Sequence, residues 1–173
     1  MNTSSGGFVR LDSSMADDLS VVNSARVSFA KSSEKIDEAG IGLISFLMRE
    51  QHGTPFEHNA FRFHIKCPVF VAREWFRHRI GSFNEFSARY SEVPNDFWKP
   101  QKESVRTQIG KPGSYSFEAV HPLIAEESIY IIEKANQSAY QEYVKLLELG
   151  IAKEVARSIL PMSFYTQFYW TVN

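Results

Sequence analysis

The chain contains the run Ala60-Phe61-Arg62-Phe63-His64-Ile65-Lys66-Cys67, and this run indicates the fold most directly. Its apolar and polar residues alternate, which is the period of a strand with one buried face. Pro68 follows at once, and proline both ends a strand and suits the first turn of a helix. We therefore expect a helix over residues 69–79. A strand that passes directly into a helix predicts a mixed fold.

Helical patterns also precede this strand. Residues 8–11 read as a short edge strand, and the Asp-Ser-Ser of residues 12–14 offers capping side chains for a helix over residues 16–27. Apolar residues recur at helical spacing over residues 37–53, where a glycine permits a left-handed C-cap. The Thr-Pro-Phe-Glu of residues 54–57 predicts one further helical turn.

The second half of the chain predicts one long helix and little sheet. Residues 80–86 and 94–115 read as loops, the second of them the most mobile segment of the chain, because both are rich in turn-forming residues. Helices are expected over residues 117–149 and 153–160, and an aromatic strand over residues 164–172. The fold class predicted is α+β, with a small, mostly antiparallel sheet packed against a long helix and several shorter helices.

Composition limits the kind of protein. The chain has 173 residues, of which 43% are hydrophobic and 23% charged, so residues 1–173 are expected to form a single domain. Lysine and arginine number 19 against 20 acidic residues, which argues against a general nucleic-acid binder. With one cysteine, no signal-peptide pattern and no apolar stretch long enough to span a membrane, we expect a cytoplasmic protein.

One run carries most of the chemistry: Arg77-His78-Arg79-Ile80-Gly81-Ser82-Phe83-Asn84-Glu85-Phe86-Ser87-Ala88-Arg89. Its arginines supply planar forks that suit phosphate oxygens, and Glu85 can accept hydrogen bonds from sugar hydroxyls. Glu74 is expected on one helical face with Arg77 and His78. A solvated basic helix end is the plainer alternative. From the residues alone we infer an anion-binding loop, without a reaction.

The pattern Arg77-His78-Arg79, seven residues and then Ser87 resembles the signature of the flavin-dependent thymidylate synthases. The similarity extends over nearly the whole chain except residues 100–116. It includes the run from Thr54 to His58, the run from Glu154 to Pro161, and the segment from Tyr165 to Asn173. The resemblance implies the fold of that family, here without the C-terminal part of its domain.

The resemblance also implies site residues. Those matching FAD-binding positions are His52, Thr54, Arg77, His78, Arg79, Glu85 and Asn173. Those matching positions around dUMP are Glu74, Arg77, Glu85, Phe86, Ser87, Ala88, Arg89 and Arg157. A helix-end cap is an alternative role for His52.

A reaction follows from the same resemblance. Family members are FAD-dependent methyltransferases that convert dUMP to dTMP, with methylenetetrahydrofolate as the one-carbon donor and NADPH as the reductant of FAD. They assemble as homotetramers whose active sites combine subunits. Arg89 and the loop at Ser87 are expected to hold the dUMP phosphate and to place the uracil against the flavin.

The family pattern usually continues for several tens of residues beyond the position of Asn173, and the continuation includes an arginine that contacts uracil. We therefore assign no residue of this chain to the chemical step. If the chain naturally ends here, we expect severely impaired or absent catalysis, and a catalytically impaired nucleotide- or flavin-binding fragment is the alternative function. Two smaller departures are Glu74, where glutamine is common, and Gln167, where arginine is frequent.

Other readings of the chain use different residues. Cys67 would be the nucleophile of the other thymidylate synthase class, but its strand predicts a small buried residue. Ser87 has no visible base partner at a suitable spacing, so we interpret it as a substrate hydrogen-bonder. A hydrolase metal site would use His52, Glu57, His58 and His64, whose spacing fits no zinc motif. A non-catalytic nucleotide- or RNA-binding module also stays open; the near-neutral charge counts against RNA.

Overall fold

The computed structural model describes residues 1–3 and 5–173. Its helices are α1 (Asp18–Arg26), α2 (Glu38–Arg49), α3 (Val69–Trp75), α4 (Pro122–Glu148) and α5 (Lys153–Ala156), with short 3-10 turns η1 (Val27–Phe29), η2 (Lys102–Ser104) and η3 (Arg157–Ile159). Its strands are β1 (Phe8–Met15), β2 (Ala60–Pro68), β3 (Ser82–Glu85), β4 (Arg106–Lys111), β5 (Ser114–Ala119) and β6 (Tyr165–Val172).

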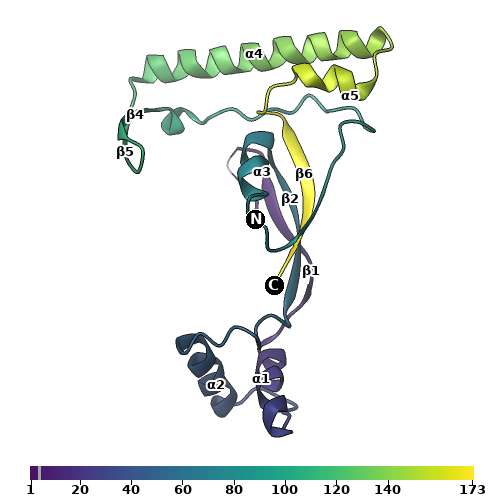
Figure 1. Cartoon of the computed structure of the whole chain (residues 1–173). Helices are drawn as coiled ribbons and strands as arrows, with labels where there is room; N and C mark the ends of the chain where they lie inside the picture. Colours follow the sequence, from purple (N-terminus) through teal and green to yellow (C-terminus); the bar gives the residue numbers. More distant parts are fainter. Residues whose placement is uncertain (4) are drawn as a thin grey trace. The chain divides into compact units, whose positions relative to one another are not determined.

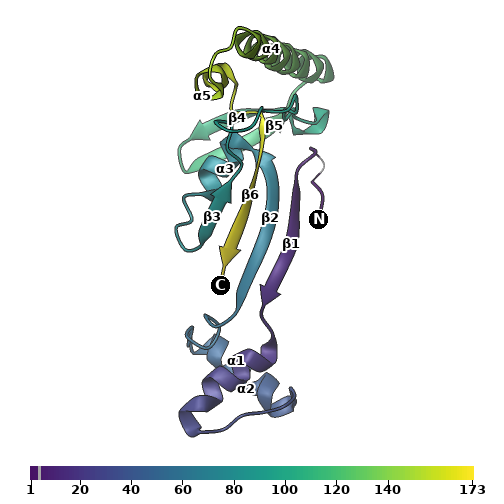
Figure 2. The same cartoon turned by 90° about the vertical axis from the view of Figure 1, so that its right-hand side faces the viewer.

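The strands form two sheets. Four of them pair in the order β1-β2-β6-β3, and Figure 2 shows neighbouring strands of this sheet running in opposite directions. β4 and β5 form a separate antiparallel hairpin, in which Lys111 is paired with Ser114 across the turn. The α+β prediction, with a small antiparallel sheet and one long helix, is confirmed.

The chain divides into two compact units. Unit 1 comprises Met1–Phe8, Lys66–Arg77 and Glu85–Gln167, and unit 2 comprises Val9–Ile65, His78–Asn84 and Phe168–Asn173. Strands β2 and β6 each contribute residues to both units. That residues 1–173 form one domain therefore stays a prediction.

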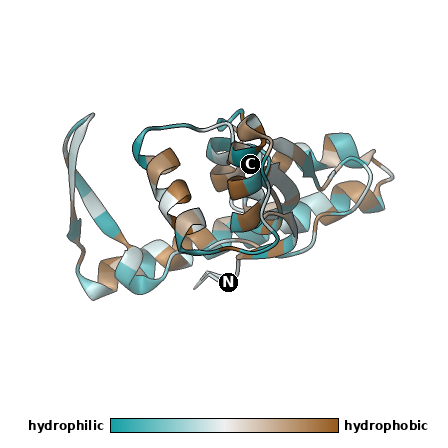
Figure 3. Cartoon of the chain, turned by 90° about the horizontal axis from the view of Figure 1, so that it is seen from below, coloured by the Kyte–Doolittle hydropathy of each residue, from teal (hydrophilic) through white to brown (hydrophobic). Residues whose placement is uncertain are grey.

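The core of unit 1 lies under α4. Tyr143 of this helix is fully buried and packs with Ala88, Val93 and Ala156. Figure 1 shows α5 lying alongside α4, and Ala156 at the end of α5 completes the cluster. Hydrophobic and hydrophilic segments alternate along the helices in Figure 3, as expected of helices that bury one face. This core therefore holds the segment that follows Glu85 against the long helix.

Helices α1 and α2 pack together in unit 2 (Figure 1). The Asp17 side chain caps α1 by accepting a hydrogen bond from the Ser20 N–H at 2.5 Å. The Asp37 side chain caps α2 by accepting one from the Gly40 N–H at 2.7 Å. A Cβ on Gly40 would lie 3.4 Å from Val22 Cγ2, which is ordinary contact distance, so Gly40 lies where the two helices meet.

The predicted boundaries of the N-terminal elements need correction. β1 continues to Met15, so the capping side chains predicted at residues 12–14 lie in a strand, and Asp17 caps the helix instead. After α2 the left-handed residue is Gln51, with a φ of 57°, rather than Gly53. Capping residues were abundant on both sides of the true boundary, so composition alone did not select among them.

Five later elements also differ from prediction. Helix α3 ends at Trp75 rather than at residue 79, and residues 82–85 form β3 rather than a loop. The predicted loop over residues 94–115 contains β4 and the start of β5, joined at Pro112 and Gly113. Gly113 has a φ of 85°, which matches the Pro-Gly pair of a type II turn. Helix α4 accordingly begins at Pro122 instead of residue 117.

Within residues 1–3 and 5–173, no helix is both long enough and apolar enough to cross a membrane.

Candidate active site

Arg77 lies just beyond the C-terminal end of α3, and its N–H donates to the Glu74 carbonyl at 3.2 Å. Because the helix has already ended, Glu74, Arg77 and His78 do not share one helical face, contrary to the sequence prediction. The Glu74 and Arg77 side chains are exposed, and neither forms an ion pair within the described residues. Both are therefore accessible to a ligand.

Two alanines of one buried cluster are each followed by an arginine. Ala88 and Ala156 are 4% and 0% exposed and belong to the cluster around Tyr143. Each directly precedes an exposed arginine, Arg89 or Arg157. Arg89 and Arg157 therefore emerge from one small core, although 68 positions separate them in the sequence. Guanidinium groups suit the oxygens of a phosphate, which makes these two exposed arginines candidates for an anion site.

Arg89 lies in a turn that begins at Ser87. The Ser87 carbonyl accepts hydrogen bonds from the N–H groups of Tyr90 and Ser91, each at 3.1 Å, and the Ser87 hydroxyl accepts from the Arg89 N–H at 3.4 Å. The Arg89 guanidinium lies 5.0 Å from the centre of the Tyr90 ring and donates to its hydroxyl at 3.0 Å. Lys153 donates to the Tyr90 carbonyl at 3.3 Å and lies 3.8 Å from Glu92 Oε1, so it ties the turn to α5 and its charge is already balanced.

Glu85 occupies the last position of β3. Its Oε1 accepts a hydrogen bond of 2.6 Å from the hydroxyl of buried Thr166 on β6. The next residue, Phe86, donates its N–H to the Gln167 carbonyl at 2.8 Å. Burial, and secondarily the negative charge of Glu85, raises the pKa of Cys67 to about 11. A thiol with that pKa stays protonated near neutral pH, so Cys67 is a poor nucleophile.

In unit 2, His52 and Thr54 line a cavity of about 650 Å³ formed with residues of α1 and α2. The remaining lining residues are Ser24, Ala25, Ser28, Phe29, Leu43, Phe46, Leu47, Gln51, Gly53, Pro55 and His58. The His52 ring meets the Phe46 ring edge-on at a centroid distance of 5.9 Å. The cavity combines apolar walls with imidazole and hydroxyl groups, as small-molecule sites do.

His78 and Arg79 are exposed and precede Gly81. Gly81 has a φ of 133°, and a Cβ there would lie 2.8 Å from the Thr171 carbonyl oxygen. Glycine therefore allows this segment to pass closely over β6. Asn173 at the end of β6 donates from Nδ2 to the Glu57 carbonyl at 3.5 Å.

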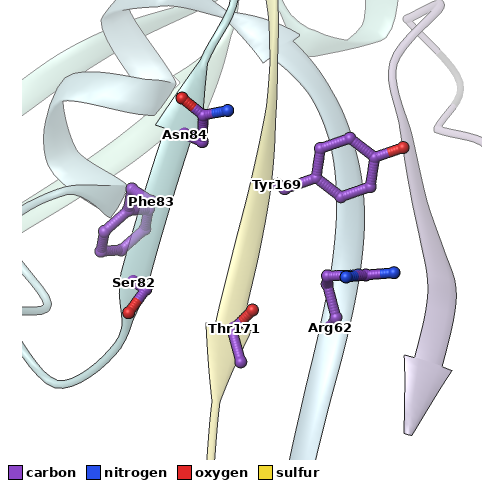
Figure 4. Close-up of a pocket in the computed structure, with 6 residues that line it drawn as sticks. All are labelled: Arg62, Ser82, Phe83, Asn84, Tyr169 and Thr171. Atoms are coloured by element: carbon purple, nitrogen blue, oxygen red, sulfur yellow. The ribbon is translucent and has the colours of Figure 1, made fainter.

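A second cavity, of about 400 Å³, lies on one face of the strands in unit 2 (Figure 4). It is lined by Arg62, Ser82, Phe83, Asn84, Tyr169 and Thr171. None of the predicted site residues lines it. Arg62 there forms an ion pair with Asp12 at 2.6 Å, so its charge is already balanced.

The hydrolase alternative gains no support from the placement of its histidines. The His64 ring stacks on the Tyr169 ring at a centroid distance of 4.8 Å, whereas His52 and His58 line the larger cavity. Within the described part of the chain, no three histidine, cysteine or acidic side chains are grouped as metal ligands.

The predicted dUMP residues, Glu74 to Arg157, all belong to unit 1. The predicted FAD residues are divided: Arg77 and Glu85 belong to unit 1, whereas His52, Thr54, His78, Arg79 and Asn173 belong to unit 2. Chemically, unit 1 offers exposed cations, a turn built on Ser87 and an oriented carboxylate. This set suits a phosphorylated sugar.

Comparison with known proteins identifies the family of the chain. The model of the family described as thymidylate synthase complementing protein matches residues 10–173. A flavin-dependent thymidylate synthase of Thermosipho melanesiensis is 48% identical over 167 residues, which cover 96% of this chain and 72% of that protein. The chain belongs to the flavin-dependent thymidylate synthase family. The family predicted from the sequence is thus confirmed.

Other members agree. A flavin-dependent thymidylate synthase of Thermus thermophilus is 43% identical over 167 residues, covering 95% of this chain and 58% of that protein. The crystal structure of a UMP/dUMP methylase, PolB, from Streptomyces cacaoi bound with 5-Br UMP superposes with a TM-score of 0.88. It is 41% identical and covers 98% of this chain and 72% of that one. The predictions of a methyltransferase enzyme and of FAD as its cofactor are confirmed through this family membership.

Sequence reasoning gave Thr166 no role, although its side chain contacts Glu85 directly. One signal was present: Thr166 carries a hydroxyl in a strand that is otherwise mostly aromatic and apolar. A hydroxyl buried in such a strand needs a hydrogen-bond partner.

Proposed function

We propose that this chain catalyses the reductive methylation of dUMP to dTMP, with its substrate held by the cationic surface of unit 1. Methylenetetrahydrofolate donates the one-carbon unit, and NADPH reduces the FAD. When bound, FAD supplies the redox chemistry. The protein's own residues bind and orient the nucleotide and shield it from water.

One observation supports the proposal most directly: Arg89 and Arg157 each follow an alanine of the buried cluster around Tyr143. Their guanidinium groups suit the two or three exposed oxygens of a nucleotide phosphate. The turn at Ser87 adds a hydroxyl and backbone groups beside Arg89. A phosphate bound there anchors one end of dUMP, which limits how the pyrimidine can be placed.

Glu85 and Arg77 are proposed to contact both dUMP and FAD. Glu85 presents an acceptor whose second oxygen is available to a sugar hydroxyl or an arginine. Arg77 is a permanent cation at the exposed end of α3. Ala88 belongs to the buried cluster around Tyr143, and Phe86 packs against that cluster. Both residues therefore hold the loop that contains Ser87 in place.

The residues of unit 2 fit an FAD molecule. His52 and Thr54 line a cavity with apolar walls and polar edges, which suits a planar ring system carrying hydrogen-bonding atoms. His78, Arg79 and Asn173 are exposed polar groups that would hold other parts of the cofactor. Glu74 is proposed to contact dUMP, as the family resemblance implies.

The phosphate assignment is tested by comparing dUMP with deoxyuridine. Replacing Arg89 or Arg157 with alanine removes a charge-assisted contact worth about 1.5–3 kcal/mol, which weakens dUMP binding by about 10- to 100-fold. Deoxyuridine binding should change little, since it carries no phosphate. Calorimetric titration measures both.

Arg106→Ala is the matched control, because Arg106 is an exposed arginine of β4 in the same unit and packs on Phe117. Equal loss of dUMP binding in Arg106→Ala would indicate a general charge effect and contradict the site.

The activity itself is tested by flavin released on denaturation and by NADPH oxidation that dUMP stimulates. A colourless protein with no dUMP-dependent turnover would overturn the proposal.

We further propose that the chain assembles as a homotetramer, binds the folate donor and works in the cytoplasm. Large apolar side chains are exposed on unit 2, including Phe29 at 76% and Met48 at 63%, as expected where subunits meet. The single buried cysteine suits a reducing compartment. Light scattering should give four times the 19.8 kDa mass of one chain. A monomer at micromolar concentration would contradict the assembly.

A further inference from the structure

We propose that Thr166 is a positioning residue for Glu85. By fixing one carboxylate oxygen, the Thr166 hydroxyl leaves the other oxygen aimed at the nucleotide. The inference rests on the proposed function, because it takes Glu85 as a ligand-contacting group. It concerns a contact inside unit 1 and a residue outside the family-matched site set.

The hydrogen bond is short, and only one of its two residues is exposed to solvent. The Thr166 hydroxyl donates to Glu85 Oε1 at 2.6 Å. Thr166 is 1% exposed, whereas Glu85 is exposed to solvent. Among the described residues, Thr166 is the hydrogen-bonding partner of the Glu85 side chain. The pair thus joins a buried donor to a carboxylate that a ligand can reach.

The backbone holds both partners. Phe86, directly after Glu85, donates its N–H to the carbonyl of Gln167, directly after Thr166, at 2.8 Å. Tyr165, directly before Thr166, donates its N–H to the Asp96 carbonyl at 3.0 Å. The backbone on both sides of Thr166 is therefore held by hydrogen bonds, which keeps the Thr166 hydroxyl beside Glu85.

A neutral donor orients Glu85 without cancelling its charge. A lysine or arginine in this place would form an ion pair and compete with a cationic or hydroxyl group of the ligand. The other nearby titratable group is Cys67, whose thiol stays protonated near neutral pH. The contact with Thr166 therefore engages one carboxylate oxygen of Glu85 and leaves the other for a ligand.

Orienting a flexible carboxylate before the ligand arrives removes part of the entropic cost of binding. Immobilising one such side chain corresponds to about a two- to tenfold change in the dissociation constant. We expect Thr166→Val, which keeps the shape and removes the hydroxyl, to weaken dUMP binding by about fivefold. Thr166→Ser, which keeps the hydroxyl, should bind dUMP within about twofold of the unmodified chain.

The deciding experiment is a double-mutant cycle on the FAD-loaded full chain. The dissociation constant of dUMP is measured by calorimetry for the unmodified chain, Thr166→Val, Glu85→Ala and the double variant. If Thr166 acts through Glu85, Thr166→Val has no further effect once Glu85 is alanine. A loss of similar size in both backgrounds would show that Thr166 merely supports the fold, and would overturn the inference.

A second pair covers the case in which Thr166→Val does not fold. Thr166→Ala and Thr166→Ser both lose the methyl group and differ only in the hydroxyl, so tighter dUMP binding by the serine variant supports the inference and equal binding overturns it. If the unmodified chain binds dUMP but the cycle is additive, the inference fails and the proposed function stands. If the unmodified chain binds neither FAD nor dUMP, the proposed function fails and the inference falls with it.

Discussion

At the scale of single residues, Tyr143 links the core of unit 1 to the proposed nucleotide loop. Its ring is fully buried against Ala88, and its hydroxyl accepts a hydrogen bond of 3.0 Å from the Val93 N–H. Ala88 stands between Ser87 and Arg89, so the packing of Tyr143 determines where that loop lies. The loop is therefore positioned by the core as well as by its own turn.

Tyr143→Phe should destabilise the protein although the ring remains. The change leaves the buried Val93 N–H without its acceptor, which costs about 1–3 kcal/mol in the free energy of unfolding. Urea denaturation measures the change. Tyr140→Phe is the control, since the Tyr140 hydroxyl makes no hydrogen bond within the described residues. Equal stability of the two variants would contradict the prediction.

Cys67 predicts a dependence of stability on pH. Its pKa is raised from 9.0 to about 11 in the folded chain. Below pH 9 both the folded and unfolded chains hold the proton, so the group contributes no pH dependence there. Between pH 9 and about 11 the unfolded chain releases the proton that the folded chain keeps. The free energy of unfolding therefore falls as the pH rises through this window.

The measurement compares the unmodified chain with Cys67→Ala from pH 8 to 11. Tyr165, whose pKa is raised first by burial and least by the charge of Cys67, is present in both proteins, so the part of its contribution that burial causes cancels in the comparison. Across the window the unmodified chain should lose about 2 kcal/mol more than Cys67→Ala. Parallel curves for the two proteins would refute the predicted shift.

At the scale of elements, the hairpin of β4 and β5 is self-contained. Every residue of both strands is exposed, and Gly110 within β4 has a φ of 100°. A Cβ at Gly110 would lie 2.4 Å from the Ser114 carbonyl oxygen. Gly110→Ala should therefore disrupt the hairpin while the cluster around Tyr143 stays intact.

Hydrogen exchange tests this. In Gly110→Ala the amides of β4 and β5 should lose protection, whereas the melting temperature should shift by about 2 °C or less, because little apolar surface is buried there. Ser116→Ala, in the facing strand, is the control, and in this variant the amides of β4 and β5 should stay protected from exchange. A loss of several degrees would mean that the hairpin supports the core.

Elements also show what sequence patterns can predict. β2 and β6 were predicted closely, because alternation and aromatic content reflect burial directly. The hairpin was missed because every residue of both strands is exposed and β4 shows no alternation of apolar and polar residues. Its local signals were the Pro112-Gly113 pair and the alternation of Tyr115 and Phe117 with polar residues in β5. β3 was missed because turn-forming residues dominate its four positions.

The site was predictable only in part for a similar reason. The motif from Arg77 to Arg89 is continuous in sequence, so its residues were recognised together. Arg157 and Arg89 are linked through Ala156 and Ala88, which are far apart in the sequence but lie in one buried cluster, and no local pattern encodes that contact. The family resemblance supplied Arg157, and the structure supplied its physical basis.

At the scale of the whole molecule, two units share strands β2 and β6. Because each of these strands is continuous, we expect both units to unfold in one cooperative transition. Calorimetry should then give equal calorimetric and van't Hoff enthalpies, with fluorescence and circular dichroism following the same curve. Two separated transitions would instead indicate two independent domains and contradict the single-domain prediction.

The turn at Pro112 and Gly113 has one practical consequence. A Cβ added at Gly113 meets no atom within 4 Å, and the strands on either side are exposed throughout. Such tips tolerate inserted peptides. A short epitope or a fluorophore attachment sequence placed between these two residues would report on the chain in cells or on a surface, at a position outside the proposed nucleotide and flavin residues.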